Sequence, residues 1–185
     1  MNQIREASMS DLESIINIMN ECIEDDSPSS NYANRLSISN PPKLLIDKIL
    51  AKKVILESDG DQVKGYAFIE PFFLDPSNDS FAQVGVYIAK KFRNGFTGPK
   101  LLIYLFHIGR KNQVKKLFSF VLEQNSTSIK NVERLFDNIG ILKKAVILNN
   151  AFNDVLIFQK NLEEPLDPRA QRFYDSVVKE NLSIR

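Results

Sequence analysis

The 185-residue sequence is poor in the residues that crosslink a small protein or hold a structural metal. It contains one cysteine and one histidine, which excludes an internal disulfide and leaves too few ligands for a structural zinc site. Its net charge of +1 lacks the basic excess that general nucleic-acid binders carry. We therefore expect a reduced protein that binds neither nucleic acid nor a structural metal.

Long apolar runs are also missing. No stretch approaches about 18 consecutive apolar residues, which argues against a membrane span. The first residues show no basic segment followed by an apolar one, as a secretory signal would. The composition is 43% hydrophobic and 25% charged, which is ordinary for a soluble domain long enough to bury one core. These features predict a cytoplasmic protein with no membrane partner.

The spacing of apolar residues predicts strands and helices in the first half of the chain. Asp59-Gly60 lies between two apolar runs, as in a β-hairpin. A capping box at Ser10 and Glu13 marks a helix start. Residues 25–40 are polar and are expected to form a loop. The predicted strands are residues 3–7, 53–58, 62–70 and 81–89, and the predicted helices are residues 11–24, 42–52 and 98–112.

In the second half, an apolar stripe from Ile129 to Ile139 predicts a helix that ends at Gly140. The other predicted elements are a strand over residues 115–124, a hairpin over 141–148 and 152–160 with Asn149-Asn150 at its turn, and a last helix from Asp167-Pro168 to about residue 182. The resulting order, β-α-α-β-β-β-α-β-α-β-β-α, predicts an α/β fold, an α+β mixed sheet with antiparallel and parallel pairs.

Residues 81–109 are the most informative segment, because a strand leads through a short glycine-containing loop into a helix. The first N–H groups of a helix lack internal partners and carry partial positive charge. The basic residues around the loop are Lys90, Lys91, Arg93 and Lys100. The segment could hold the pyrophosphate of a nucleotide-bearing cofactor; the alternative is an ordinary strand-to-helix connection with surface lysines. Neither a P-loop nor a Rossmann fingerprint is present.

Several short motifs occur in an order that is typical of one superfamily. They are IREA at residues 4–7 followed by Asp11-Leu12, DG at 59–60 followed by GYA at 65–67, VGVYI at 84–88, RNGFTG at 93–98 and LFDNIG at 135–140. Over residues 3–161 the sequence resembles the GCN5-related N-acetyltransferases (the GNAT superfamily), and within them the phosphinothricin acetyltransferase branch. The resemblance implies a GNAT-like acyl-CoA N-acyltransferase domain over residues 1–162 and a C-terminal helical extension over residues 163–185.

The resemblance also implies a chemistry. The protein is expected to be an acetyl-CoA-dependent N-acetyltransferase that acts on the amine of a small molecule, by direct transfer in a ternary complex. The residues then expected to contact the cofactor are Val86, Ile88, Arg93, Asn94, Gly95, Phe96, Thr97, Gly98, Lys100 and Asn125. The candidate catalytic residues are Gln83, Tyr87 and Glu70. Tyr87 shares a strand face with Gln83, and Glu70 could receive the amine proton through water; ordinary packing or surface roles are the alternatives.

Three residues depart from the family pattern. Phe96 occupies a position where the loop usually has glycine, Gln83 stands where the branch has a glutamate base, and Phe136 replaces a tyrosine that many members use as an acid. Glutamine cannot act as a base near neutral pH, and phenylalanine cannot donate a proton. The alternative function is therefore a catalytically impaired GNAT-fold module that binds acyl-CoA or regulates.

Two further features leave alternatives open. Gly85 in mid-strand indicates either a bulge or the close approach of another group. The last helix has an apolar stripe at Ala170, Phe173 and Val177. This stripe must be buried either on its own domain or on a second chain, which leaves a homodimer open.

Overall fold

The computed structural model describes residues 2–24, 34–74, 77–148 and 150–182, and its elements follow the predicted order. The strands are β1 (Asn2–Glu6), β2 (Val54–Asp59), β3 (Gln62–Pro71), β4 (Phe81–Ile88), β5 (Lys116–Leu122), β6 (Asp137–Leu148) and β7 (Ala151–Asn161). The helices are α1 (Leu12–Ile23), α2 (Lys43–Leu50), α3 (Thr97–Lys111), α4 (Ser126–Val132) and α5 (Pro168–Leu182), with short 3-10 turns at Met9–Asp11 and Lys90–Phe92. Much of the predicted loop 25–40, and Asn149 of the predicted turn, lie outside the described residues.

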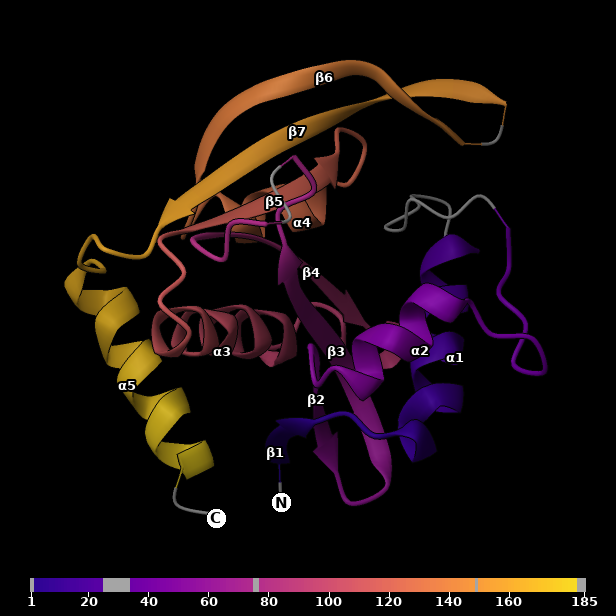
Figure 1. Ribbon diagram of the computed structural model, residues 1–185, viewed down its shortest axis with the longest axis horizontal. Helices are drawn as coiled ribbons and strands as arrows, with labels where there is room; N and C mark the ends of the chain where they lie inside the picture. Colours follow the sequence, from indigo (N-terminus) through magenta and orange to yellow (C-terminus); the bar gives the residue numbers. More distant parts are fainter. Residues whose placement is uncertain (1, 25–33, 75–76, 149, 183–185) are drawn as a thin grey trace.

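All seven strands join one mixed sheet in the order β1-β2-β3-β4-β5-β7-β6. β4 and β5 are parallel, and the other neighbours are antiparallel, so the predicted mixed sheet is confirmed. Helices α1 and α2 lie on one side of the sheet and α3 and α5 on the other, while β6 and β7 arch over the end opposite the two termini (Figure 1). None of the helices in the described ranges combines the length and apolar character that crossing a membrane requires.

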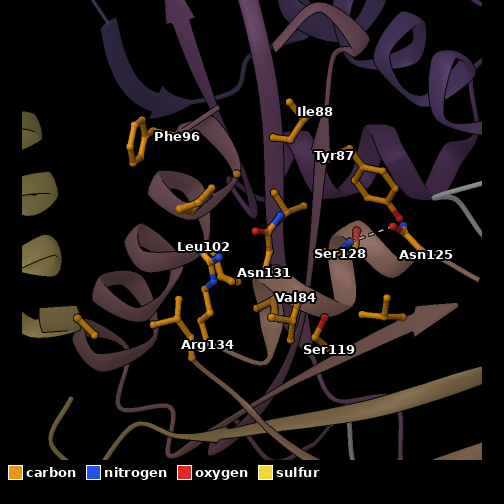
Figure 2. Close-up of a pocket in the computed structure, with 18 of the residues that line it drawn as sticks. Val84, Tyr87, Ile88, Phe96, Leu102, Ser119, Asn125, Ser128, Asn131 and Arg134 are labelled. Atoms are coloured by element: carbon orange, nitrogen blue, oxygen red, sulfur yellow. Dashed lines mark hydrogen bonds between the residues drawn. The ribbon is translucent and has the colours of Figure 1, made fainter. Parts of the chain in front are cut away.

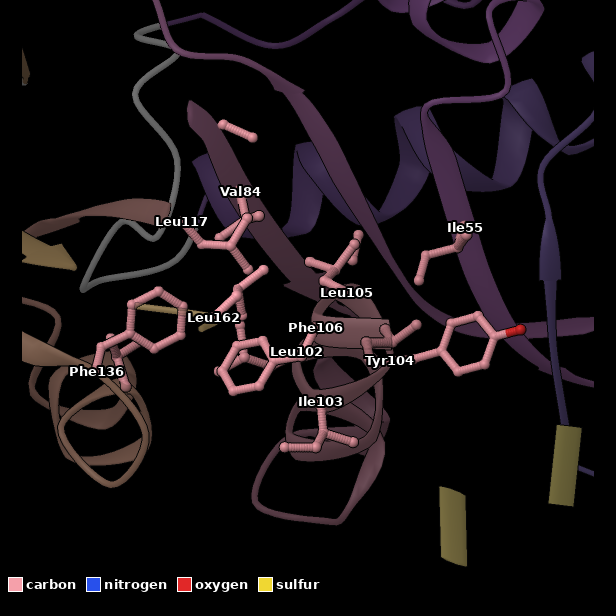
Figure 3. Packing of buried hydrophobic residues seen from close by; sticks show 14 of the residues in the cluster. Ile55, Val84, Leu102, Ile103, Tyr104, Leu105, Phe106, Leu117, Phe136 and Leu162 are labelled. Carbon is pink, nitrogen blue, oxygen red and sulfur yellow. The ribbon is translucent and has the colours of Figure 1, made fainter. Parts of the chain in front are cut away.

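Apolar clusters on both faces hold the helices on the sheet. The cluster on the α1 side joins Ile15, Ile16 and Met19 of α1 to Val54, Leu56 and Tyr66 of the sheet. On the other face, α3 contributes six consecutive buried residues, which pack among side chains of β4, β5 and the segment after α4 (Figure 3); they are Leu101, Leu102, Ile103, Tyr104, Leu105 and Phe106. A helix buried this deeply gives its N-terminal turn a rigid position beside β4.

An ion pair holds the segment between β1 and α1. Arg5 donates to both carboxylate oxygens of Asp11, at 2.8 and 2.7 Å, and this hydrogen bonding lowers the pKa of Asp11 to about 2. Ser8 donates its backbone N–H to the same carboxylate at 2.8 Å. The helix start is therefore organised by Ser8 and Asp11, and the predicted capping box at Ser10 and Glu13 is wrong, because a 3-10 turn precedes α1.

A second difference from the prediction lies after α4. The apolar stripe predicted as one helix to Gly140 is divided, since α4 ends at Val132 and β6 begins at Asp137. Phe136 is buried, but Ile139 is 51% exposed on β6. The helix prediction is wrong beyond Val132 because backbone pairing of β6 with β7 outweighs the helical spacing of these apolar residues.

The C-terminal helix α5 packs on its own domain. Asn181 is buried and accepts the backbone N–H of Ile4 at 2.7 Å. The hydroxyl of Tyr174 lies 3.3 Å from Nδ1 of His107 on α3, and Val177 between them is 1% exposed. The stripe residues Ala170 and Val177 are thus buried on the chain's own domain, and the homodimer stays a prediction.

Candidate active site

The two central parallel strands, β4 and β5, pair over only half of β4. Their register joins residues 81–84 of β4 to residues 116–119 of β5. β4 continues to Ile88 and β5 to Leu122, so the strands separate beyond this register. Backbone groups that β4 directs toward β5 in its second half are therefore outside the pairing, and a ligand can enter between the two strands.

A cavity of about 720 Å³ lies at this opening, beside α3, and is called the α3-side cavity below (Figure 2). Its apolar wall is formed by Val84, Val86 and Ile88 of β4 and by Leu102 of α3. Neutral polar side chains come from β5 and from α4 or its cap: Ser119, Asn125, Ser128 and Asn131. The size and the mixture of apolar wall and few polar groups are typical of a small-molecule site.

A second cavity of about 410 Å³, called the α1-side cavity below, is lined by α1, α2, β3 and the other face of β4. Its wall is largely aromatic, with Tyr66, Phe68, Phe73, Tyr87 and Phe120. The ring of Tyr87 stacks 5.1 Å from that of Tyr66 and 6.3 Å from that of Phe68. These stacked rings give the cavity a firm apolar surface.

Three polar residues of the α1-side cavity form one network. Nε2 of Gln83 donates to Oε1 of Glu70 at 2.7 Å, and Nζ of Lys48 lies 2.9 Å from Oε2 of Glu70. Glu70 and Gln83 meet because they are cross-strand partners in β3 and β4. The side chains of Lys48 and Glu70 are only 14% and 16% exposed. Glu70 is thus a carboxylate held on both oxygens at a largely solvent-shielded position, and all three predicted catalytic residues line this cavity.

The two cavities meet at β4 and β5, where Val84, Gly85 and Tyr87 of β4 and Phe120 of β5 line both of them. Gly85 pairs with Phe68 in an uninterrupted register. A Cβ atom at position 85 would stand 2.5 Å from the Phe68 ring, so glycine is required there by the close approach of that ring. The Phe68 ring fills the space of the missing side chain, and the residues that both cavities share lie beside the point where β4 and β5 stop pairing.

Five of the ten residues predicted to contact a cofactor line the α3-side cavity: Val86, Ile88, Phe96, Gly98 and Asn125. Asn125 caps α4, since its side-chain oxygen accepts the backbone N–H of Ser128 at 3.0 Å (Figure 2). Phe96 is 74% exposed at the start of α3. The structure thus brings the central strand, the end of the loop and the cap of α4 together around one cavity.

The loop residues Arg93, Asn94 and Gly95 are not among the described residues that line this cavity. Nε of Arg93 donates to the carbonyl oxygen of Ile88 at 3.1 Å, and its guanidinium reaches Sγ of Cys22 at 3.6 Å. Asn94 has a φ of +65°, a left-handed conformation that asparagine adopts more readily than most residues. Arg93 and Asn94 therefore shape the loop, and their contact with a cofactor remains a prediction.

Thr97 and Lys100, also predicted to contact the cofactor, face away from the α3-side cavity. Thr97 is buried in the first turn of α3. Nζ of Lys100 lies 3.7 Å from a carboxylate oxygen of Glu57 on β2 and 3.4 Å from one of Glu180 on α5. Lys100 therefore links α3 to the sheet and to the C-terminal helix.

The lining residues that sequence reasoning did not assign to a site include Lys48, Arg134, Arg169 and Phe173. Lys48 belongs to no motif, and Arg134 follows a helix whose end was misplaced. Arg169 offered a signal, because it lies in the first turn of α5, where a cation is unfavourable beside the positive end of the helix dipole. The Asp167 carboxylate, which accepts backbone N–H groups of this turn, also attracts the Arg169 charge.

Phe136, which replaces the tyrosine of the family pattern, belongs to the core. It is 3% exposed, and its ring centroid lies 5.5 Å from that of Phe106. Tyr87, in contrast, lines both cavities. Within the described part of the chain, no group of three His, Cys, Asp or Glu side chains is placed to hold a metal ion.

A seven-stranded mixed sheet with diverging central strands, five helices and a cavity in that opening defines the class of fold: it is the GNAT acyl-CoA N-acyltransferase fold. The GNAT-like fold predicted from the sequence is thereby confirmed. No family model matches the sequence, and no curated protein matches it.

Solved structures of N-acetyltransferases match the chain over most of its length. An N-acetyltransferase from Staphylococcus aureus Mu50 is 19% identical with a TM-score of 0.79, over 88% of this chain and 99% of that one. A GNAT-superfamily phosphinothricin acetyltransferase from Sinorhizobium meliloti, in complex with AcCoA, is 18% identical with a TM-score of 0.76, over 90% and 94%. A ribosomal-protein-alanine N-acetyltransferase from Brucella melitensis is 26% identical with a TM-score of 0.76, over 85% and 98%. The names of these neighbours include different acceptors, so the fold by itself selects none.

Proposed function

We propose that this protein is an acetyl-CoA-dependent N-acetyltransferase that acetylates the amine of a small molecule, with both substrates bound together. The observation that carries the proposal is the meeting of two cavities at Gly85 and Tyr87, one on each face of β4. Direct transfer requires two sites that share one point, because the reacting atoms must be held in contact. The acetyltransferase neighbours, one of them in complex with AcCoA, support the assignment.

The α3-side cavity fits acetyl-CoA. Val84, Val86 and Leu102 offer an apolar wall for the acyl and pantetheine portion, and the amides of Asn125 and Asn131 offer hydrogen bonds to its polar groups. When bound, acetyl-CoA supplies a thioester: the amine nitrogen forms a bond to the acyl carbon, the carbon–sulfur bond breaks, the thiol leaves and the amine gives up a proton. The unpaired backbone N–H groups of β4 beyond Val84 would stabilise the negative charge that develops on the acyl oxygen.

The α1-side cavity would hold the acceptor, and Glu70 would accept the proton of its amine, directly or through a water molecule. Gln83 cannot serve as a base, but it orients Glu70 through the hydrogen bond of 2.7 Å. The carboxylate that the family pattern places at position 83 is thus supplied by the cross-strand partner of that position. An amine carried on an apolar or aromatic body suits the wall formed by Tyr66, Phe68 and Phe120.

The proposal is tested by thermal unfolding with acetyl-CoA and by release of free thiol in the presence of a panel of small amines. Saturating acetyl-CoA should stabilise the protein, since a ligand that binds only the native state must do so. Glu70→Gln should lower turnover by about 10² to 10⁴ and leave acetyl-CoA binding unchanged. Asp79→Asn is the matched control, because Asp79 is an exposed carboxylate shortly before β4.

Two outcomes would contradict the proposal. No thermal stabilisation by acetyl-CoA would remove the cofactor assignment and the function with it. Stabilisation without thiol release for any amine would favour the second candidate, a binding or regulatory module. The specific observations that favour this second candidate are the glutamine at position 83 and the burial of Phe136 in the core.

A further inference from the structure

The cations that face the α3-side cavity are not the ones that surround the glycine loop. Lys100 is paired with Glu57 and Glu180, and the guanidinium of Arg93 is directed to the backbone of Ile88 and to Cys22. The charged residues that line the cavity are Arg134, Arg169 and Asp167. They come from the segment after α4 and from the start of α5.

The two guanidinium groups are available for a ligand. Arg134 and Arg169 are both exposed, and among the described residues neither forms an ion pair with a carboxylate. Asp167, the one acidic residue of the lining, is engaged locally, because its Oδ1 accepts the backbone N–H groups of Arg169 at 2.9 Å and Ala170 at 3.1 Å. Among the described residues, the cavity therefore presents two guanidinium groups without an ion pair, one of which, Arg169, is also attracted by the nearby Asp167 carboxylate.

We propose that Arg134 and Arg169 bind the phosphate groups at the nucleotide end of the acyl-CoA, and that α5 forms the wall of the cavity at that end. This inference rests on the proposed function and adds to it the residues that recognise the nucleotide. Figure 2 shows Arg134 projecting between α3 and the opening beside β4, with α5 along the side of the cavity where Phe96 lies. Phe173 of α5 is half-buried and lines the same cavity.

The chemistry of the two side chains supports this assignment. A guanidinium group is permanently charged and can donate two parallel hydrogen bonds to a phosphate. The predicted C-terminal extension would then contribute to cofactor binding. Contacts of α5 with α3 and β1, which involve His107, Asn181 and Lys100, hold Arg169 at the cavity.

The test compares two ligands that differ at the nucleotide end, by isothermal titration with the full chain. Acetyl-CoA carries the phosphates, and S-acetyl-pantetheine lacks them. Arg134→Ala and Arg169→Ala should each weaken acetyl-CoA binding by at least about tenfold, and leave binding of S-acetyl-pantetheine unchanged. Lys130→Ala on α4, four residues before Arg134, and Arg172→Ala on α5, three residues after Arg169, are the matched controls, because both are exposed cations outside the cavity lining.

The outcomes separate this inference from the function on which it rests. If wild type binds acetyl-CoA and the two arginine variants bind it equally well, the phosphate assignment is overturned while the proposed function stands. If the variants lose affinity for both ligands to the same degree, the arginines act through packing and the inference is again overturned. If wild type binds no acetyl-CoA, both proposals fall. Arg169→Lys should restore only part of the affinity, since lysine keeps the charge but not the paired donors.

Discussion

The cavities on the two faces of β4 differ in whether their charged side chains are paired. On the α3 side, the strand presents Val84 and Val86 to a cavity whose guanidinium groups carry no partner among the described residues. On the α1 side, Gln83 belongs to a network in which Lys48 and Glu70 already neutralise each other at 14% and 16% exposure. Alternating side chains of one strand thus separate a surface suited to an anionic ligand from a pocket suited to proton transfer.

Gly85 lies between the two cavities and lines both of them. Any side chain at position 85 would project toward the ring of Phe68, on the α1 side. The strand must be thin where an acyl group on one face is to meet an amine on the other, and it must be rigid to keep them in line. The stacking of Tyr87 on Tyr66 and Phe68 supplies rigidity next to this position.

Beside the loss expected for Glu70→Gln, the largest effect among the tests of this comparison should come from a side chain at position 85. Gly85→Ala would place a methyl group 2.5 Å from the Phe68 ring and force the ring into the α1-side cavity. We expect the kcat/KM for the amine to fall by about a hundredfold, because small displacements of a bound substrate have effects of this size, while the affinity for acetyl-CoA stays unchanged. Steady-state kinetics and titration measure the two quantities separately.

Two further variants complete the experiment on Gly85. Phe68→Leu in the Gly85→Ala background should restore part of the activity by making room for the new methyl group. Gly140→Ala on β6 is the control, since a Cβ there would meet no atom within 4 Å and Gly140 lines neither cavity. Equal loss of acetyl-CoA affinity and of amine turnover in Gly85→Ala would show that the two faces are one site.

The sequence predicted the framework of the site better than its charged groups. The order of elements, the hairpin at Asp59-Gly60 and the central strand follow from local patterns, and Gly60 takes the positive φ of 57° expected of such a turn. The ion pairs of the Lys100 side chain could not be predicted, because its partners Glu57 and Glu180 are far from it in the sequence. Distant packing overrides a local cluster of basic residues.

The same reasoning applies to the residues that were missed or misread. Glu70 was identified as a carboxylate, but its contact with Gln83 depends on the register between β3 and β4, which a connection of nine residues between the strands does not fix. Arg134 lies where an apolar stripe suggested a longer helix, and β6 pairing ended that helix early. The spacing of apolar residues along the sequence cannot show that a distant strand will pair with the same residues.

A smaller effect is expected at Asp11. This variant tests whether a loss of activity is specific to changes at one face of β4. Asp11 is remote from both cavities, and its pKa is lowered from 3.8 to about 2 by hydrogen bonds from Arg5. A lowered pKa in the folded state stabilises the protein above the unfolded pKa, and this stabilisation is lost as the pH falls from about 4 to about 2. Asp11→Asn should therefore lower the free energy of unfolding by about 2 kcal/mol at pH 7.

Chemical denaturation at pH 7 and at pH 2.5 measures this contribution. The difference between wild type and Asp11→Asn should fall to about a third at the lower pH, and Asp61→Asn, at an exposed turn position, should change stability little at either. At pH 7 and moderate temperature, the variant should retain both acetyl-CoA affinity and turnover. A selective loss of turnover would place the β1–α1 segment in the acceptor site, which would then extend beyond the α1-side face of β4.

The smallest effect is expected at Lys48, whose ammonium group contacts both Glu70 and the ring of Phe68, with 4.2 Å to the ring centroid. Lys48→Met keeps the apolar stem and removes the charge, so Glu70 retains only Gln83 as a partner. We expect the free energy of unfolding to fall by about 1 kcal/mol, at the upper end for a partly exposed pair, and turnover to fall by less than in Glu70→Gln. Lys52→Met, with its side chain 74% exposed, is the control. Because Lys48 lines only the α1-side cavity, acetyl-CoA affinity should not change, and a clear decrease in that affinity would refute the separation of the two faces of β4.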